Sequence, residues 1–466
     1  MPTPSSNSRR HFLKTAIAAG ISTSYLSSFT AWASPASKKV RHAQVGVFRR
    51  GAHDLRNIAS HPNVEIVALC DINKTKLQAA ATRFPKARLY QDWREMLAKE
   101  ANHIDSVCIS TPDHMHAPIA MRAMQLGKHV FCQKPLTHTV YEGRQLAKTA
   151  AEKKLVTQMG TQIASTFSNR MTEKLLKEGA IGKIKEIYCW SNKNARAAAS
   201  AIAPNATPLT QPAGNPLPPE GPPPATLDWD GWIGVAPTRP CRRQFYHSGA
   251  WRKWQDFGGG HLGDMGCHIL NTPLSALGMP APISIQTQVD PEWIKDALRY
   301  RESFPLWQII EYTFPGSKIT AGKTVKLTWS DGGKLPLHKF KPLVGNNPLP
   351  TEGMLAIGTK GVLLLPHVSI APKIYPKRKL AAVKFENTNH YHQYIDAILA
   401  NKPAMAISRF PLAAPLSEAV LLGVIAARFP GKSLQWNTKA MKFSNHPAAN
   451  KSLRTTYRKG WEEKGL

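Results

Sequence analysis

Acidic residues are scarce in this sequence of 466 residues. Lys and Arg number 61, Asp and Glu only 30, and the formal net charge is +31. Such an excess is typical of proteins that bind nucleic acid, an anionic polymer or an acidic membrane surface. The basic residues are scattered, however, and no run of them forms a nucleic-acid-binding stripe. We therefore expect no nucleic-acid partner, and the charge fits either an anionic glycan substrate or a solvated basic face.

Long apolar runs are also lacking. The first 33 residues combine the pair Arg9-Arg10, a following Phe-Leu-Lys, a short apolar run and the cleavage pattern Ala31-Trp32-Ala33. These are the parts of a twin-arginine signal, the bacterial export route for folded proteins. The sequence predicts a signal peptide at residues 1–33, the Tat translocase as a partner during export, and a periplasmic location. No later run reaches the length that a bilayer-spanning helix needs.

Cysteine is rare, and its spacing provides no metal or redox motif. The six cysteines contain no C-x-x-C, and Cys70, Cys108 and Cys132 each lie in an apolar run. A buried cysteine in such a run behaves as a small hydrophobic residue. A chain that folds under reducing conditions before export need not form disulfides. We expect free thiols and no metal site.

The first half of the chain alternates between strand-like and helix-like segments, which is typical of a parallel, doubly wound α/β sheet. Right-handed crossovers bring the carboxyl ends of such strands to one edge, where ligands bind. The predicted strands cover residues 43–48, 64–70, 105–110 and 130–132, and the predicted helices cover 52–61, 74–84, 93–100, 118–126 and 142–153. A strand that ends at Met159 closes this domain, which we place at residues 34–160.

The second predicted domain, residues 161–466, is richer in strands. Residues 203–226 are rich in Pro, Ala and Thr and are predicted to form a surface loop that either borders the site or is a dispensable insertion. Predicted helices cover residues 169–177, 391–400 and 416–428. Predicted strands cover residues 185–192, 283–289, 308–314, 319–328 and 354–365, the last broken by a hairpin turn at 358–361.

The first strand ends in a degenerate dinucleotide-binding turn, G-V-F-R-R-G. Gly46 and Gly51 fit the first and last glycines of the G-x-G-x-x-G fingerprint. Phe48 takes the place of the middle glycine, where a side chain would crowd the phosphates, and the arginines Arg49 and Arg50 would offset this by pairing with phosphate. Asp71 follows the second strand, where a carboxylate accepts the ribose 2′-hydroxyl of NAD. Asp71 fits equally as a helix N-cap, and the arginines leave NADP open.

Polar residues also follow the third and fourth strands. Thr111, Pro112, His114 and His116 lie in the run T-P-D-H-M-H, and Gln133 and Lys134 precede Pro135. Metal sites need three or four ligands with supporting partners, so we expect the histidines to pack against a cofactor or to bond at the rim of a substrate site. Lys134 is either a cation held on a stiff turn or a solvated loop lysine.

A glycine-rich loop precedes a second candidate pair. Asp264 and His268 follow G-G-G-H-L-G at positions i and i+4, hence on one face of a helix. A carboxylate that orients a histidine is a common general acid–base arrangement. The alternative is a helix N-cap aspartate beside a packed histidine, and the residues alone favour neither.

Taken together, these motifs resemble the Gfo/Idh/MocA family, named for glucose–fructose oxidoreductase and inositol dehydrogenase. The resemblance covers essentially the whole mature chain and is strongest to the exported, twin-arginine branch. It rests on the degenerate glycine turn, Cys70-Asp71, the run at 111–116 and Q-K-P-L-T-H at 133–138. Members usually have Glu-Lys-Pro, and this chain has Gln133 in the place of the glutamate.

The resemblance implies a Rossmann domain followed by an α/β domain whose large, open, mainly antiparallel sheet faces the cofactor; such sheets often form contacts in homo-oligomers. It also implies that Lys134 polarises a substrate oxygen while His268, oriented by Asp264, acts as the base. The residues expected to bind NAD, or NADP, are then Gly46, Phe48, Arg49, Gly51, Asp71, Thr111, Pro112, His114, His116, Gln133, Lys134 and Gln162.

Three functions are compatible with this resemblance. The first is an NAD(P)-dependent oxidoreductase that acts on a sugar, polyol or glycoside. The second is a glycoside hydrolase that keeps NAD bound and recycles it within each turnover. Export favours this second function, because the periplasm holds no pool of free nicotinamide cofactor. The third is a sugar-binding relative that has lost redox chemistry, suggested by Phe48 in the glycine turn.

Overall fold

The computed structural model describes residues 39–192, 219–242, 245–247, 249–345, 348–368, 370–377 and 388–466. The predicted signal peptide and most of the predicted proline-rich loop lie outside these residues. The chain divides into Met1–Lys39 and a compact unit, Val40–Leu466.

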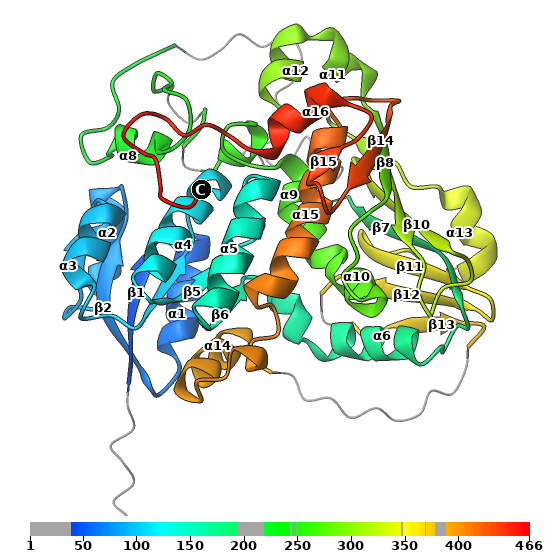
Figure 1. Cartoon of the computed structure of the whole chain (residues 1–466), viewed down its shortest axis with the longest axis horizontal. Coiled ribbons are helices and arrows are strands. Elements are labelled where there is room, and N and C mark those ends of the chain that lie inside the picture. Colours follow the sequence, from blue (N-terminus) through cyan, green and yellow to red (C-terminus); the bar gives the residue numbers. More distant parts are fainter. Residues whose placement is uncertain are drawn as a thin grey trace, which may run out of the picture. The chain divides into compact units, whose positions relative to one another are not determined.

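Six parallel strands form the first sheet, in the order β3-β2-β1-β4-β5-β6 (Figure 1). The order reverses between β1 and β4, and ligands bind at such a reversal, beyond the carboxyl ends of the strands. The strands are β1 (Val40–Val45), β2 (Val64–Cys70), β3 (Arg88–Tyr90), β4 (Ser106–Ile109), β5 (His129–Cys132) and β6 (Thr157–Met159).

Helices cover both faces of this sheet, as its strongly apolar strands require. They are α1 (Arg50–Ala59), α2 (Lys74–Ala81), α3 (Trp93–Glu100), α4 (His116–Gln125) and α5 (Val140–Glu152). Local capping fixes where several of them begin. Thr139 and Glu142 form a capping box at α5, and Asn73 accepts a bond from the Lys76 N–H at α2. Asn73 is therefore the N-cap of α2, and the alternative that Asp71 serves as this N-cap is wrong.

The second sheet has nine strands in the order β13-β12-β11-β7-β10-β9-β8-β14-β15. Every neighbouring pair is antiparallel except β7 and β10. The strands are β7 (Ile184–Ser191), β8 (Ser284–Val289), β9 (Gln308–Pro315), β10 (Thr324–Asp331), β11 (Glu352–Gly358), β12 (Val362–Pro366), β13 (Lys373–Tyr375), β14 (Ser433–Asn437) and β15 (Lys442–Phe443). The fold is thus the α/β fold predicted from the sequence.

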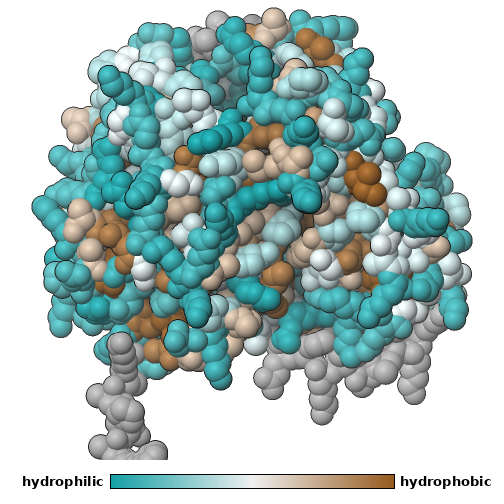
Figure 2. Space-filling model, in the orientation of Figure 1, coloured by the Kyte–Doolittle hydropathy of each residue, from teal (hydrophilic) through white to brown (hydrophobic). Residues whose placement is uncertain are grey.

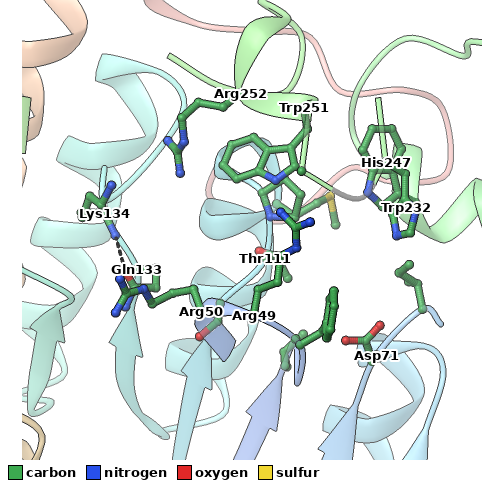
Figure 3. A pocket seen from close by; sticks show the side chains of 18 of the residues that line it. Arg49, Arg50, Asp71, Thr111, Gln133, Lys134, Trp232, His247, Trp251 and Arg252 are labelled. Carbon is green, nitrogen blue, oxygen red and sulfur yellow. Dashed lines mark hydrogen bonds between the residues drawn. The ribbon is translucent and has the colours of Figure 1, made fainter. Parts of the chain in front are cut away.

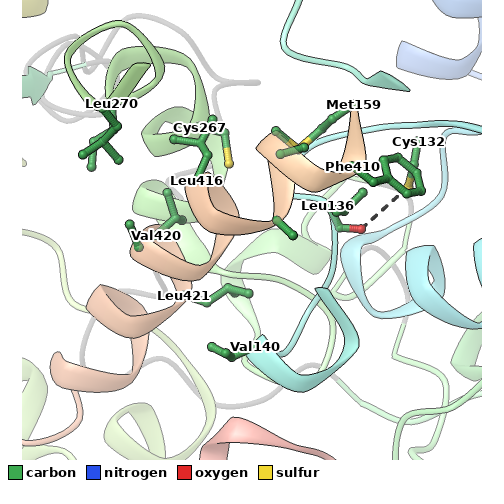
Figure 4. Packing of buried hydrophobic residues seen from close by; sticks show 14 of the residues in the cluster. Cys132, Leu136, Val140, Met159, Cys267, Leu270, Phe410, Leu416, Val420 and Leu421 are labelled. Atoms are coloured by element: carbon green, nitrogen blue, oxygen red, sulfur yellow. Dashed lines mark hydrogen bonds between the residues drawn. The ribbon is translucent and has the colours of Figure 1, made fainter. Parts of the chain in front are cut away.

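Helix α15 (Phe410–Ala426) joins the two halves through one continuous hydrophobic core. In Figure 4 its side chains Leu416 and Val420 lie beside those of Cys267 and Leu270, and Phe410 lies beside Met159 and Cys132. The other helices of the second half include α6 (Phe167–Lys177), α9 (Gly260–Ile269), α10 (Asn271–Leu277), α13 (Leu337–Val344) and α14 (His390–Leu399). The short helices are α8 (Trp229–Ile233), α11 (Pro291–Lys295), α12 (Ala297–Glu302) and α16 (Pro447–Asn450).

Part of the second sheet is covered on its other side. Phe340 and Val344 of α13 pack against Tyr188, Trp190 and Leu355 of β7 and β11. The face shown in Figure 2 is mainly hydrophilic, and its hydrophobic residues appear in small separate patches. Among the described helices, none combines the length and apolar character that crossing a bilayer requires. All six cysteines lie in described residues, and none forms a disulfide.

Candidate functional site

A cavity of about 700 Å³ lies beyond the carboxyl ends of β1, β2, β4 and β5. Figure 3 shows Lys134 and Gln133 at one end and Asp71 at the other, with Arg49 and Thr111 between them. The cavity is therefore at the reversal of strand order, where a doubly wound sheet binds dinucleotides.

Two glycines permit a tight turn beside this cavity. At Gly46, with φ +82°, a Cβ would lie 2.7 Å from the Ser110 carbonyl oxygen, and at Gly51 it would lie 2.1 Å from the Gly46 oxygen. Neither position accepts a side chain, as the fingerprint requires. Phe48 lines the cavity but is 41% exposed, and Lys76 Nζ lies 4.3 Å from its ring centroid. The ring therefore does not fill the space beside the turn.

Asp71 lies in the cavity wall at the end of β2. Its Oδ2 accepts the Val47 N–H at 2.9 Å, and its Oδ1 accepts the Asn73 N–H at 2.9 Å. Burial raises the pKa of this carboxyl group, and the two backbone donors act in the opposite direction. The carboxylate is thus fixed in place at the position where a ribose hydroxyl would donate to it.

A segment of the second half forms the opposite wall of the cavity near Asp71. The Lys74 N–H donates to the Thr226 carbonyl oxygen at 2.8 Å, and the Asp228 N–H donates to the Ile72 oxygen at 2.9 Å. Beyond these bonds, Trp232, His247 and Trp251 line the cavity. In Figure 3 the Trp251 side chain lies across the cavity from Thr111 and Arg49. We call residues 226–242, 245–247 and 249–252 the roof of the cavity.

At the other end of the cavity, Lys134 and Asp264 form an ion pair. Lys134 Nζ lies 2.7 Å from Asp264 Oδ1, and both side chains are mostly buried. Burial lowers the pKa of Lys134, and the Asp264 charge opposes that effect. Asp264 lies inside α9, whose N-cap is Gly259. The alternative of an N-cap aspartate is therefore wrong.

Arg252 extends this pair into a network. Its Nη1 donates to Asp113 Oδ2 at 3.2 Å, and its Nε lies 3.4 Å from Asp264 Oδ1. Asp113 is 1% exposed and also accepts the Gly259 N–H at 3.3 Å. Asp113 lies in the run T-P-D-H-M-H, which the sequence marks as a candidate. No sequence pattern, however, indicates its ion pair with Arg252, which is 139 positions away.

His268 faces the same end of the cavity from α9. Burial and the Lys134 charge lower its pKa well below the usual value, so the imidazole is neutral near pH 7. Its Nδ1 atom is buried and bonds to none of the described residues. Its ring centroid lies 5.8 Å from that of His367, which also lines the cavity. Lys134, Asp264 and His268 are thus brought together, although the ion pair of Asp264 is with Lys134.

A buried carboxylate lies beneath the turn at Gln133. Asp54 of α1 is fully buried and accepts bonds from Gln133 Nε2 at 2.9 Å, Ser110 Oγ at 2.7 Å and Tyr391 Oη at 2.7 Å. A glutamate at position 133 would place a second carboxylate against it. An amide rather than a carboxylate at position 133 therefore suits this buried site.

Four residues expected to bind the cofactor do not line the cavity: Gly51, His114, His116 and Gln162. Gly51 is buried in the first turn of α1. Both ring nitrogens of His116 lie within hydrogen-bond distance of backbone oxygens, Nδ1 at 2.8 Å from Pro135 and Nε2 at 3.0 Å from Thr111. His116 thus ties two strand-end loops together behind the cavity. His114 Nε2 lies 3.2 Å from the Trp232 oxygen, and Gln162 Nε2 donates to Tyr391.

Further residues of the cavity escaped the sequence analysis, among them Arg252, Glu352, His367 and the aromatic residues of the roof. They come from loops and strand ends of the second half, whose approach to the first sheet depends on tertiary packing. Among the described residues, His, Cys, Asp and Glu side chains form no group of three that fits a metal ion.

The chain matches two family models of the Gfo/Idh/MocA oxidoreductases. Residues 40–161 match the model of the NAD-binding Rossmann fold, and residues 213–463, more than half of the chain, match that of the C-terminal alpha/beta domain.

Curated relatives match over part of their length. Levoglucosan dehydrogenase of Pseudarthrobacter phenanthrenivorans is 33% identical over 116 residues, which is 25% of this chain and 29% of that protein. A glycosyl hydrolase family 109 protein of Shewanella pealeana is 33% identical over 202 residues, and the alpha-N-acetylgalactosaminidase of Shewanella oneidensis is 29% identical over 203. Each of these two matches covers 38% of this chain and 44% of the relative. The chain thus spans less than half the length of these relatives.

Solved structures share the fold. The WlbA dehydrogenase of Chromobacterium violaceum, in complex with NADH and UDP-GlcNAcA, has a TM-score of 0.59 at 17% identity and covers 86% of this chain and 97% of its own. An inositol dehydrogenase homolog of Azotobacter vinelandii, complexed with NADH and myo-inositol, has a TM-score of 0.56 at 16% identity, covering 86% and 98%. With both of its halves matched, this chain belongs to the Gfo/Idh/MocA family of NAD-binding oxidoreductases.

Proposed function

We propose that this protein is an exported enzyme that oxidises a hydroxyl-bearing carbon of a sugar, polyol or glycoside with bound NAD. One observation carries the proposal. Lys134, Asp264 and His268 meet at one end of a cavity that also contains the glycine turn and has a fixed carboxylate, Asp71, at its other end. The curated relatives and the solved neighbours act on or bind sugars and polyols by their names, which supports a carbohydrate substrate.

The residues of the cavity fit a dinucleotide. Gly46 and Gly51 permit a tight turn in which a Cβ at either position would clash with the backbone, Arg49 and Arg50 line the cavity beside the turn, and Asp71 offers a carboxylate to a ribose hydroxyl. The dinucleotide, when bound, supplies the hydride acceptor, and the protein orients the reactants and handles the proton. Asp71 favours NAD over NADP, because it would repel a 2′-phosphate.

The proton chemistry then belongs to three side chains. The Lys134 ammonium, held by Asp264, would polarise the substrate oxygen. His268 is neutral near pH 7 because of burial and the nearby ammonium, so it is ready to accept the hydroxyl proton. A positioned general acid or base typically contributes about 10²- to 10⁴-fold to a rate. Arg252 would hold Asp264 in place through its contact with the carboxylate.

We further propose that NAD stays bound through export and turnover. The roof supports the retention of NAD, because its backbone bonds to the loop after β2 and its aromatic side chains enclose the cavity beside Asp71. The twin-arginine pattern at residues 1–33 supports export in the folded state to the periplasm. Retained NAD favours the second candidate function, net glycoside hydrolysis, which the family 109 names among the relatives also support.

Cofactor content tests the proposal. The mature protein is purified, denatured and examined for released NAD(H) by absorbance and mass spectrometry, and we expect about one NAD per chain. Cleavage of aryl glycosides without net NADH then selects the hydrolase, and net NADH selects the dehydrogenase. A protein that contains no nicotinamide and binds neither NAD nor NADP would be the degenerate sugar-binding relative.

A further inference from the structure

Strand ends from the interior of the second sheet form part of the cavity wall. Strand β7 ends there at Ser191, β11 begins there at Glu352, and His367 directly follows β12. Ser191 and Glu352 are paired neighbours on β7 and β11. The His367 backbone N–H donates to the backbone carbonyl oxygen of Glu352 at 2.9 Å. Glu352 and His367 both line the cavity together with the residues of the proposed redox site.

Buried polar groups orient the Glu352 carboxylate. Ser191 Oγ donates to Glu352 Oε1 at 2.7 Å, and His261 Nε2 lies 2.9 Å from that same hydroxyl oxygen. Ser191 is fully buried and His261 is 6% exposed. Because a hydroxyl has one proton, Ser191 accepts from His261 while it donates to Glu352. His261 lies on α9, the helix that also carries Asp264 and His268.

Asp264 and Glu352, two carboxylates that line this cavity, differ in their charge partners. Asp264 is paired with Lys134 and Arg252. Within the described part of the chain, no Lys or Arg lies within ion-pair distance of Glu352. A carboxylate locked to a cation is a poor proton donor, whereas one that is held by a hydroxyl can exchange its proton with a ligand. The site thus contains an acid–base group that oxidation of an alcohol does not need.

We propose that Glu352 is a second catalytic acid–base residue, which protonates the oxygen that leaves a glycoside substrate. The inference rests on the hydrolase form of the proposed function. Bound NAD would supply the hydride acceptor for a transient oxidation, in which His268 takes the hydroxyl proton and a carbonyl makes the proton on the neighbouring carbon acidic. His367 takes that proton, and the electron pair of the carbon–hydrogen bond forms a double bond to the next carbon. The bond from that next carbon to the leaving oxygen breaks with its electron pair on oxygen, and Glu352 donates a proton to that oxygen.

Water completes the cycle. Its oxygen bonds to the carbon that lost the leaving group, its proton goes to the Glu352 carboxylate, and His367 returns the proton to the neighbouring carbon. Return of the hydride that bound NAD would hold, together with the His268 proton, would restore the alcohol. Glu352, His367 and His268 then have their starting protonation states, the leaving group carries the first Glu352 proton and water has replaced it, so the net reaction is hydrolysis with no consumption of NAD.

Leaving-group dependence tests the role of Glu352. Wild-type protein and Glu352→Gln are compared on methyl and 4-nitrophenyl α-N-acetylgalactosaminide, because 4-nitrophenolate leaves without protonation and methoxide does not. We expect Glu352→Gln to lose 100-fold or more on the methyl glycoside and less than tenfold on the nitrophenyl glycoside. NADH binding, followed by fluorescence, should be unchanged. Glu311→Gln, the same change at an exposed site on β9, is the matched control and should lose nothing on either substrate.

The outcomes separate the two proposals. Equal losses on both glycosides, or loss of NADH binding, would overturn the role of Glu352 and leave the hydrolase function standing. A wild-type protein that forms NADH with a free sugar but cleaves neither glycoside would refute the hydrolase function, and the role of Glu352 with it.

Discussion

At the scale of single residues, burial sets the charge states of the proposed site. Lys134 and His268 share a partly desolvated space, and burial favours the neutral form of each. The Asp264 carboxylate opposes this effect of burial on Lys134 through an ion pair at 2.7 Å. One ammonium and one neutral imidazole therefore coexist, which is the combination that proton removal from an alcohol needs.

Replacing Lys134 with alanine should stop turnover without releasing the cofactor. We expect kcat to fall at least 10³-fold, because the variant lacks the cation beside the substrate oxygen. A loss of this size is within the usual range for acid–base groups. The dissociation constant for NADH, measured by fluorescence titration, should change less than threefold. Lys99→Ala, at a lysine that is 63% exposed on α3, is the control. Lost NADH binding with an unchanged rate would contradict the role of Lys134.

Replacing Gln133 with glutamate should destabilise the protein. The new carboxylate would face Asp54, which is fully buried and accepts a bond from Gln133 Nε2 at 2.9 Å. An unpaired charge or a lost bond at a buried site costs about 2–4 kcal/mol. Urea denaturation measures the change. The double variant Gln133→Glu with Asp54→Asn should recover most of the loss, because amide and carboxylate have then exchanged places. A double variant as unstable as the sum of its parts would show that the pairing is unimportant.

At the scale of elements, local patterns predicted the first half of the chain better than the second. The strand at 64–70 and the helix at 93–100 have the predicted ends, since both are bounded by turn or capping residues. Strand β3 was not predicted, because its three half-exposed residues show no alternation of buried and exposed positions. Strand β10 begins at Thr324 rather than 319, because Ser317 and Thr320 bond to each other in a turn.

Helix α15 begins at Phe410, earlier than the predicted residue 416. The sequence places Pro415 where a proline normally breaks a helix. In the structure the helix passes through Pro415, because residues on both sides of it are buried in the core that joins the two sheets. The residues of the site show the same difference between local and long-range contacts. Residues at strand ends were predictable, whereas the roof, Arg252 and Glu352 depend on contacts between distant segments.

The packing of α15 against the second sheet leaves no room at Gly423. A Cβ there would lie 2.0 Å from Tyr312 Oη and 2.8 Å from Leu262 Cδ2, and both side chains are fully buried. We expect Gly423→Ala to lower the free energy of unfolding by about 1–3 kcal/mol, the usual cost of an overpacked core. Gly143→Ala in α5, where the nearest atom is Thr137 Oγ1 at 3.1 Å, should cost less. Equal stability of Gly423→Ala and wild type in urea would refute this packing argument.

The roof should control how long the cofactor stays bound. Trp251 lines the cavity across from Thr111, and its replacement by alanine opens the wall. We expect Trp251→Ala to lose bound NAD during gel filtration, with dissociation at least tenfold faster in a stopped-flow displacement assay. Trp307→Ala changes an indole that is absent from the cavity wall and serves as the control. Equal NAD content in all three proteins would contradict retention by the roof.

At the scale of the whole molecule, several histidines are buried in the neutral state. Burial lowers the pKa of His42 and of His114 to about 3, and that of His390 to about 4. In the unfolded chain a histidine has a pKa near 6.5. Between these values the unfolded chain binds protons that the folded protein excludes. Stability is therefore complete above about pH 6.5 and falls as the pH drops toward 4.

We expect the free energy of unfolding to decrease between pH 7 and pH 5, by up to about 2 kcal/mol for each of these histidines. Urea denaturation at pH 7, 6 and 5 measures the slope. His42→Gln removes one titrating group and should flatten the slope even where it lowers stability at pH 7, because His42 is fully buried beside Ser106. A wild-type slope of zero, or equal slopes for wild type and His42→Gln, would show that these histidines are not buried in the neutral state.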